Sequence, residues 1–137
     1  MAITEEVIYH LSKNIKTKLS VSSIDGIGVF AITDIKKGEE IFPIWQNDSG
    51  IYTIPNDRLI DIPNVVLDLL NMYFINTESD YKIIRLFKGF NFLFHGFIFC
   101  NSAYPNEQNT NITNDGIALR DINAGEEILE WYTKNIN

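Results

Sequence analysis

The stretch SSIDGIGVFAITDIKKGEEIF, residues 22–42, places two glycine turns between apolar segments. The first turn, Asp25-Gly26, lies between the alternating segment KTKLSVSSI and the apolar run GVFAITDI, and both segments have strand character. The second turn, at Gly38, leads into EEIFPIW, where Pro43 indicates an edge strand or a bend. The stretch therefore predicts short strands joined by tight turns.

The rest of the chain adds one main helix and more short strands. In DIPNVVLDLLNMYFIN, residues 61–76, apolar residues recur at helical spacing, and Pro63 suits the first turn of a helix. A short N-terminal helix is predicted for TEEVIYHLS. Beyond Asp80, four further segments are predicted to be strands: YKIIRLF, FNFLFHGFIF, GIALRDI and EEILEWY. This order predicts a mainly β or α+β fold that forms a single domain over residues 1–137.

The composition is that of a globular protein. Of its 137 residues, 45% are hydrophobic, which suffices for a packed core. No apolar run approaches the roughly 20 residues that a membrane helix needs, so no membrane association is expected. The N-terminal residues do not resemble a signal peptide, so the expected compartment is the cytoplasm, with the nucleus as the alternative in a eukaryotic host.

The net charge and the cysteine content limit which classes of partner and which kinds of site are expected. The formal net charge is -7 and the lysines are scattered, whereas a nucleic-acid-binding protein would show a basic face. An acidic surface suits a basic peptide or protein instead. The alternative is that the charge only keeps the protein soluble. A single cysteine excludes an internal disulfide framework, and two histidines cannot assemble a zinc site, so no metal is expected.

Three segments in this order resemble the SET domain, the fold of many protein-lysine methyltransferases. They are residues 22–42, then FIFCNSAYPN (residues 97–106), then DINAGEEILEWY (residues 121–132). The resemblance implies a SET-type β-clip fold of small curved sheets with a C-terminal pseudoknot. It also implies S-adenosylmethionine on one face and a target lysine that enters a narrow channel from the other.

The resemblance assigns candidate roles to five residues. Gly26, Ile27 and Gly28 would hold the methionine part of the cofactor through main-chain groups, because glycines let the backbone approach a ligand closely. Tyr132 falls on the family's catalytic tyrosine, and Tyr81 falls, by position alone, near a further active-site tyrosine. The structural alternatives are a tight turn for the glycines and ordinary strand tyrosines for the other two.

The chain departs from the family's pattern at three places. Cys100 and Asn101 stand where the family has an Asn-His pair that contacts the cofactor. A thiol cannot replace an amide as a hydrogen-bonding group, so Asn101 is expected to supply part of the lost bonding, with Cys100 at the cofactor site but not a nucleophile. Glu130 takes the family's penultimate aromatic position. Only TKNIN follows Tyr132, which implies a minimal SET domain without a post-SET module.

The resulting hypothesis is an S-adenosylmethionine-dependent protein-lysine N-methyltransferase that acts on a basic protein or peptide. A partner chain, such as a second copy in a homodimer, the substrate or a shorter channel would complete its lysine site. The first alternative is a degenerate SET protein that binds the cofactor or a protein partner without transferring methyl groups. The second is a β-clip interaction module without a cofactor. Cofactor binding separates this last alternative from the others.

Overall fold

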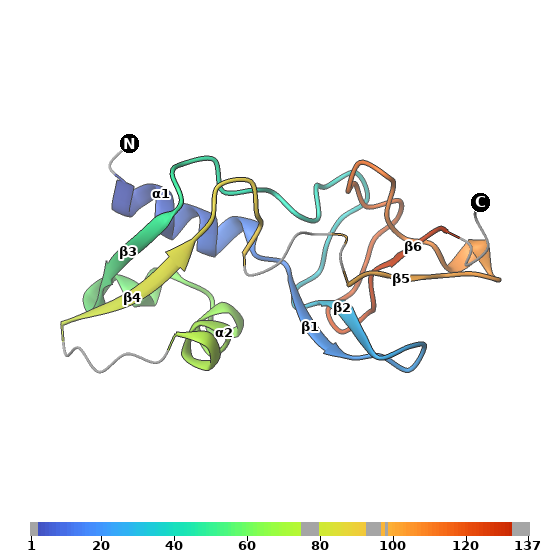
Figure 1. Ribbon diagram of the computed structural model, residues 1–137, viewed down its shortest axis with the longest axis horizontal. Helices are drawn as coiled ribbons and strands as arrows, with labels where there is room; N and C mark the ends of the chain where they lie inside the picture. The colour runs from blue at the N-terminus through green and yellow to red at the C-terminus, as the bar shows by residue number, and fades with distance from the viewer. Residues whose placement is uncertain (1–2, 75–79, 93–96, 98, 133–137) are drawn as a thin grey trace. The chain divides into compact units, whose positions relative to one another are not determined.

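The computed structural model describes residues 3–74, 80–92, 97 and 99–132. Its helices and strands are labelled in Figure 1. The chain divides into two compact units: unit 1 consists of Met1–Ile15 and Pro43–His95, and unit 2 consists of Lys16–Phe42 and Gly96–Asn137. The single domain expected over the whole chain stays a prediction.

Unit 1 combines short helices with one antiparallel sheet. Its elements are α1 (Ile3–Tyr9), the π-helical η1 (His10–Asn14), β3 (Gly50–Pro55), the 3-10 helix η2 (Asn56–Asp61), α2 (Asn64–Tyr73) and β4 (Tyr81–Leu86). The first two elements confirm the N-terminal helix predicted for TEEVIYHLS. Val7 and Leu11, on successive turns, are buried in the core of this unit.

Helix α2 forms where the apolar spacing predicts it. Its buried face consists of Val66, Leu69 and Leu70. Pro63 lies just before the helix. An N–H at this position would have no partner within the helix, so the missing N–H of proline costs no hydrogen bond. At the other end, the Lys82 ammonium donates a hydrogen bond of 2.9 Å to the carbonyl oxygen of Phe74. A cation at this position stabilises the helix, because the carbonyl end of the helix dipole is negative.

Strands β3 and β4 pair in a register that runs from Gly50 opposite Leu86 to Pro55 opposite Tyr81. Strand β4 confirms the prediction made for YKIIRLF. Strand β3 was not predicted, because its apolar and polar side chains alternate only weakly. Ile54 is its one buried residue. Pairing with β4 therefore makes this segment a strand, and the side-chain pattern of the segment alone does not.

A network of polar groups is buried in unit 1. Nε2 of His10 donates to the Asn91 carbonyl oxygen at 2.6 Å, and Nδ1 accepts from the Asn14 amide at 3.0 Å. The Asn91 amide donates to the carbonyl oxygens of Asn14 and Pro43, at 2.9 and 2.6 Å. The His10 ring also meets Trp45 edge to face, with centroids 5.4 Å apart. Burial lowers the pKa of His10, and the bond to Asn91 opposes this effect.

We predict that His10 makes the stability of the protein depend on pH below neutrality. Because the pKa of His10 is lower in the folded state, the unfolded state takes up its proton more readily as pH falls below about 6.5. The stabilisation is present above that pH and is lost below it. The melting temperature of wild type should therefore fall more between pH 7.5 and 5.5 than that of His10→Gln. Equal decreases in the two proteins would contradict the prediction.

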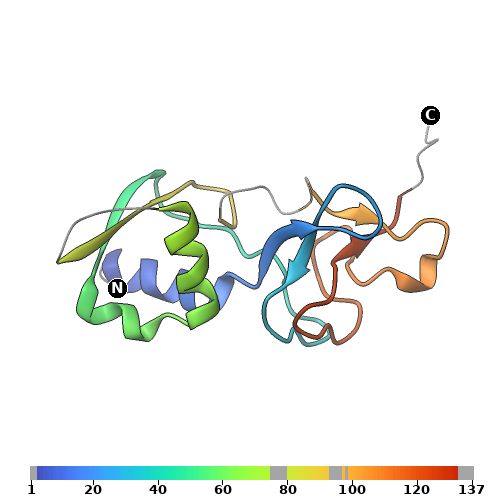
Figure 2. The ribbon, with the colours of Figure 1, turned by 90° about the horizontal axis from the view of Figure 1, so that it is seen from below.

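Unit 2 holds two further small sheets (Figure 2). Its elements are β1 (Thr17–Val21), β2 (Ile27–Ala31), β5 (Asn101–Ser102), the 3-10 helix η3 (Glu107–Asn109) and β6 (Leu129–Glu130). β1 and β2 form an antiparallel hairpin that confirms two predicted strands. β5 and β6 are parallel, and they join segments that are distant in the sequence. The core of the unit includes Val29, Ile35, Ile41, Ile122 and Ile128, each at most 1% exposed.

Two predicted strands of unit 2 are reduced to isolated bridges. EEIFPIW and GIALRDI meet where Glu40 pairs with Ile117. Gly38 and Gly116 lie at positive φ, 89° and 84°, close to that pair. The chain turns at both glycines, which limits the pairing here to this bridge, and pairing resumes in the same register where Ile35 is opposite Ile122. EEILEWY is likewise shortened to β6. FNFLFHGFIF lies partly outside the described residues, and its described part forms no strand.

The fold class agrees with the prediction made from the sequence. Within the described residues there are three two-stranded sheets, short helices and one ten-residue α-helix, which is an α+β architecture of small sheets. In the part of the chain that the structure describes, no helix has the length and apolar character needed to cross a bilayer.

Candidate functional site

The turn between β1 and β2 is held by Ser22. The Ser22 N–H donates to the Gly26 carbonyl oxygen at 2.8 Å, and the Ser22 hydroxyl oxygen accepts from the Ile24 N–H at 3.0 Å. Gly26 has a φ of +47°, in the left-handed region that favours glycine. A Cβ on Gly26 would meet nothing within 4 Å, so the space on that side of the turn is open.

The carboxylate of Glu127 lies against this hairpin and accepts hydrogen bonds from two side chains. The Ser22 hydroxyl lies 2.8 and 2.9 Å from its two oxygens, and the Asn101 amide donates to Oε2 at 2.9 Å. The same Asn101 amide also donates to the Asp25 carbonyl oxygen at 3.0 Å. We call Ser22, Asp25, Gly28, Asn101 and Glu127 the glutamate corner. Asn101 connects the turn and the carboxylate within it.

Gly28 is required at this corner because of Glu127. Its φ is not in the left-handed region, so the backbone alone does not need glycine there. A Cβ on Gly28 would lie 2.3 Å from Oε2 of Glu127 and 3.2 Å from the Asn101 amide nitrogen. The close approach expected between Gly28 and a cofactor is thus, in this structure, a close approach to the protein's own carboxylate.

The other face of the β5–β6 sheet carries a different set of groups. Asn101 is opposite Leu129 and Ser102 is opposite Glu130, and side chains alternate between faces along each strand. Glu130 therefore shares a face with Ser102. Cys100 precedes Ser102 by two residues and Tyr132 follows Glu130 by two residues, just outside the paired strands. We call Cys100, Ser102, Glu130 and Tyr132 the tyrosine face.

Ser102 fixes the backbone of Tyr132. The Tyr132 N–H donates to the Ser102 hydroxyl oxygen at 3.1 Å, and the hydroxyl donates to the Tyr132 carbonyl oxygen. The Tyr132 side chain is 38% exposed, so an incoming ligand can reach its ring. Burial raises the pKa of Tyr132, and the negative charges of Glu130 and Asp25 raise it further. The phenol is therefore protonated at neutral pH.

Cys100 is buried, and its thiol is expected to be unreactive. It is 4% exposed, and burial together with the charges of Glu130 and Glu127 raises its pKa to about 12. A nucleophilic cysteine needs the thiolate form at working pH, which this surrounding disfavours. Burial and the raised pKa both argue against a nucleophilic role for Cys100, which stays a prediction. Its predicted place at a cofactor site stays a prediction.

The remaining predicted site residues are separated between the units. Ile27 ends the β1–β2 hairpin opposite Val21 and is 52% exposed, next to Gly26 and Gly28. Tyr81 begins β4 in unit 1, where it is opposite Pro55 and 36% exposed. The structure thus brings the turn glycines and Asn101 together in unit 2. A shared role for Tyr81 and Tyr132 stays a prediction.

Sequence reasoning did not single out Ser22 or Glu127. Both lie inside the quoted motifs, Ser22 at the start of the first and Glu127 in the Gly-Glu-Glu turn of the third. A signal was present in the Gly-Glu-Glu pattern, where Glu126 bonds to its own turn at the Asn123 N–H. Nothing local indicates that Glu127 binds Ser22, 105 positions earlier.

The chemistry of these groups suits a cationic ligand. S-adenosylmethionine carries a sulfonium and an ammonium against one carboxylate, so it is a net cation. The side chains of Asp25, Glu127 and Glu130 provide negative charge in unit 2. The Gly26 carbonyl oxygen is used within the turn, and the space where a side chain of Gly26 would lie is open. The Asn101 amide donates both hydrogens inside the protein, which leaves its oxygen for a ligand.

Similarity to known proteins is found among solved structures. No family model matches the chain, and no curated protein matches its sequence. One similar solved structure is a Plasmodium falciparum protein described as a histone methyltransferase, with 22% identity and a TM-score of 0.39 over 89% of this chain and 96% of that chain. Another is the methyltransferase domain of human PR domain-containing protein 2, with 20% identity and a TM-score of 0.40 over 97% and 86%. At such TM-scores neither likeness decides a family or an activity.

We predict that Gly28→Ala destabilises the protein through Glu127. The added Cβ displaces the carboxylate and breaks its bonds to Ser22 and Asn101, which costs about 1.5–3 kcal/mol for hydrogen bonds to a charged group. In Glu127→Ala these bonds are already absent, so adding Gly28→Ala should cost much less. Chemical denaturation measures both steps. Gly50→Ala, where nothing lies within 4 Å, is the control, and additive losses would contradict the mechanism.

We predict that the Cys100 thiol of the folded protein resists alkylation. With its pKa raised to about 12, the thiolate fraction at pH 8 is roughly a thousandfold below that of an ordinary cysteine. Iodoacetamide labelling, followed by mass spectrometry, should therefore be at least about a hundredfold slower in native protein than in urea. Equal rates would show that Cys100 is neither buried nor surrounded by negative charge.

Proposed function

We propose that this chain is an S-adenosylmethionine-dependent protein-lysine N-methyltransferase of the SET type. The observation that carries the proposal is the pair of hydrogen bonds from the Asn101 amide. Asn101 belongs to the second SET-like motif, Asp25 to the first and Glu127 to the third. One side chain thus joins the three segments whose order resembles the family, at the corner where the resemblance implies a cofactor.

The main chain at the hairpin would hold the cofactor. Gly26 leaves open space beside the main chain, and Ile27 next to it offers an exposed apolar surface. The oxygen of Asn101 and the carboxylate of Asp25 are acceptors for an ammonium group. When bound, S-adenosylmethionine supplies a methyl group activated on sulfur. The residues of the chain supply binding, orientation and charge.

The tyrosine face would receive the lysine. Methyl transfer needs a neutral amine, and free lysine has a pKa of about 10.4, so the site must favour the uncharged form. The Tyr132 phenol is protonated, and its oxygen can accept a hydrogen bond from the amine and orient it. The net charge of -7 suits a basic protein or peptide as substrate. A role for Tyr81, a single functional domain and a cytoplasmic location belong to the same proposal.

A second candidate is a SET-like protein that binds the cofactor or a partner without transferring methyl groups. Both Asn101 amide hydrogens are used within the protein, and Cys100 is a poor substitute for an amide. The cofactor thus has fewer hydrogen-bonding partners than the family's Asn-His pair would offer. This observation favours weak cofactor binding, with which a non-catalytic role is compatible.

We predict that the protein binds S-adenosylmethionine and that Tyr132→Phe retains this binding but lowers methyl transfer on the order of a hundredfold, because the orienting hydroxyl is lost. Isothermal titration calorimetry measures binding, and labelled cofactor with basic proteins measures transfer. Tyr104→Phe, at another exposed tyrosine of unit 2, is the matched control.

Three outcomes separate the functions. Binding together with Tyr132-dependent transfer supports the enzyme. Binding without transfer by wild type supports the non-catalytic protein. No binding at millimolar cofactor excludes both and leaves an interaction module without a cofactor.

A further inference from the structure

Strand β1 pairs with β2 along one of its two edges. Hydrogen bonds at both ends of this pairing fix which residues of β1 bond to β2. The Ile32 N–H donates to the Lys16 carbonyl oxygen at 2.9 Å, and the Ser22 N–H donates to the Gly26 carbonyl oxygen at 2.8 Å. Along an antiparallel ladder, hydrogen-bonded positions alternate with positions whose main-chain groups point to the other edge. The main-chain groups of the odd-numbered residues of β1 therefore point away from β2.

The bonds of β2 agree with this alternation. Val29, which is opposite Leu19, accepts a hydrogen bond of 2.7 Å from the Ile128 N–H on its side away from β1. The outer edge of β2 is thus occupied by other parts of unit 2. On the outer edge of β1, the main-chain groups of Leu19 and Val21 make no hydrogen bond within the part of the chain that the structure describes. This edge of β1 is therefore available to a further strand.

The side chains near this edge are suited to a protein contact. Val21 is 83% exposed, while Ile27 opposite it and Ile24 in the turn are each 52% exposed. Thr17 at the other end of β1 is buried, so the accessible part of the edge consists of Leu19 and Val21. A short edge with exposed apolar side chains is a template for pairing with another chain.

We propose that the outer edge of β1 binds the same edge of a second copy of this chain in antiparallel pairing, so that the two hairpins form one four-stranded sheet. The symmetry of such a pair fixes the register. Leu19 of each copy must lie opposite Val21 of the other, because these residues carry the available main-chain groups. Ser20 then lies opposite its own counterpart at the twofold axis. Each Leu19–Val21 pair forms two main-chain hydrogen bonds and brings two apolar side chains together.

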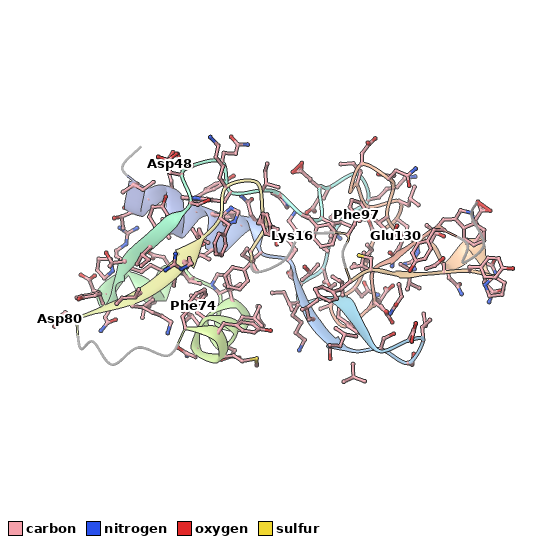
Figure 3. The ribbon with its side chains drawn as sticks, in the orientation of Figure 1. Lys16, Asp48, Phe74, Asp80, Phe97 and Glu130 are labelled. Carbon is pink, nitrogen blue, oxygen red and sulfur yellow. The ribbon has the colours of Figure 1, made fainter. Side chains whose placement is uncertain are left out.

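The charges near the edge are compatible with this register. Lys16, labelled in Figure 3, is already bound to Glu39 at 3.1 Å, and Lys18 is the one charged residue within β1 itself. In the proposed pairing Lys18 lies opposite Ser22 of the second copy, and residues opposite each other share a face. The Ser22 hydroxyl donates to the Glu127 carboxylate at 2.8 Å. The Lys18 ammonium therefore comes near a carboxylate of the second copy, and no like charges are opposite each other.

The dimer is expected to be weak. Its contact is small, and the net charge of -7 on each copy repels the other copy at long range. We therefore expect a dissociation constant on the order of 100 µM. Sedimentation of wild type between about 10 µM and about 1 mM should show the change from monomer to dimer. Amide hydrogen exchange at Leu19 and Val21 should slow over the same range, because their N–H groups become hydrogen-bonded.

Exchanging charges at the twofold axis tests the register. Ser20 is exposed, and Ser20→Lys places two positive charges opposite each other, which should weaken the dimer at least about tenfold. Ser20→Glu should do the same with two negative charges. Mixing the two variants places opposite charges at the axis and should restore dimer formation. Thr33→Lys and Thr33→Glu are matched controls, since Thr33 is an exposed residue of unit 2 outside β1. Their mixture should dimerise no more than either variant alone.

The outcomes separate this contact from other surfaces. Wild type that stays monomeric at about 1 mM overturns the inference whether or not the variants fold, and leaves the edge of β1 to a strand of another protein. A dimer that persists unchanged in folded Ser20→Lys, or a mixture that gives no recovery, also overturns it, because the copies then meet elsewhere. Pairing through β1 does not require S-adenosylmethionine, so failure of cofactor binding would leave this dimer in place.

Discussion

The two hydrogen bonds from the Asn101 amide hold together three segments of unit 2 that are far apart in the sequence. One bond reaches the turn at Asp25 and the other reaches Glu127, which in turn binds Ser22 at the base of the hairpin. A half-buried carboxylate needs such donors, because hydrogen bonds to a charged group offset the loss of hydration. Gly28 makes this arrangement possible by having no side chain where the carboxylate lies.

Near the short parallel pairing of β5 and β6, some polar groups are bound within the protein and others are exposed. On one face, Asn101 and Glu127 are occupied by each other and by the hairpin. Ser102, the other residue of β5, binds the backbone of Tyr132, whose side chain is exposed. Cys100 fits this division as a buried, protonated thiol at the edge of the tyrosine face. It fills space, while its neighbour Asn101 makes the polar contacts that a buried thiol cannot make.

Much of the fold follows from local patterns. The turn at Gly26 and helix α2 were predicted correctly, because a glycine at positive φ and a helical apolar period are properties of a few consecutive residues. Strand β3 was missed, since its pairing with β4 determines its conformation. EEIFPIW has the composition of a strand, yet turns at Gly38 and Gly116 limit its pairing to one bridge.

The same division applies to the candidate site. The sequence alone determined the order of the three motifs, the turn glycines, Asn101 beside Cys100, and the tyrosine at the end of the third motif. The tertiary structure alone decided that Glu127 binds Ser22 and Asn101, and that Gly28 is required by a carboxylate. It also decided that Glu130 is opposite Ser102, whose hydroxyl accepts from the Tyr132 N–H. The physical reason is that hydrogen bonds and charges depend on distance in space, and these partners are up to 105 residues apart along the chain.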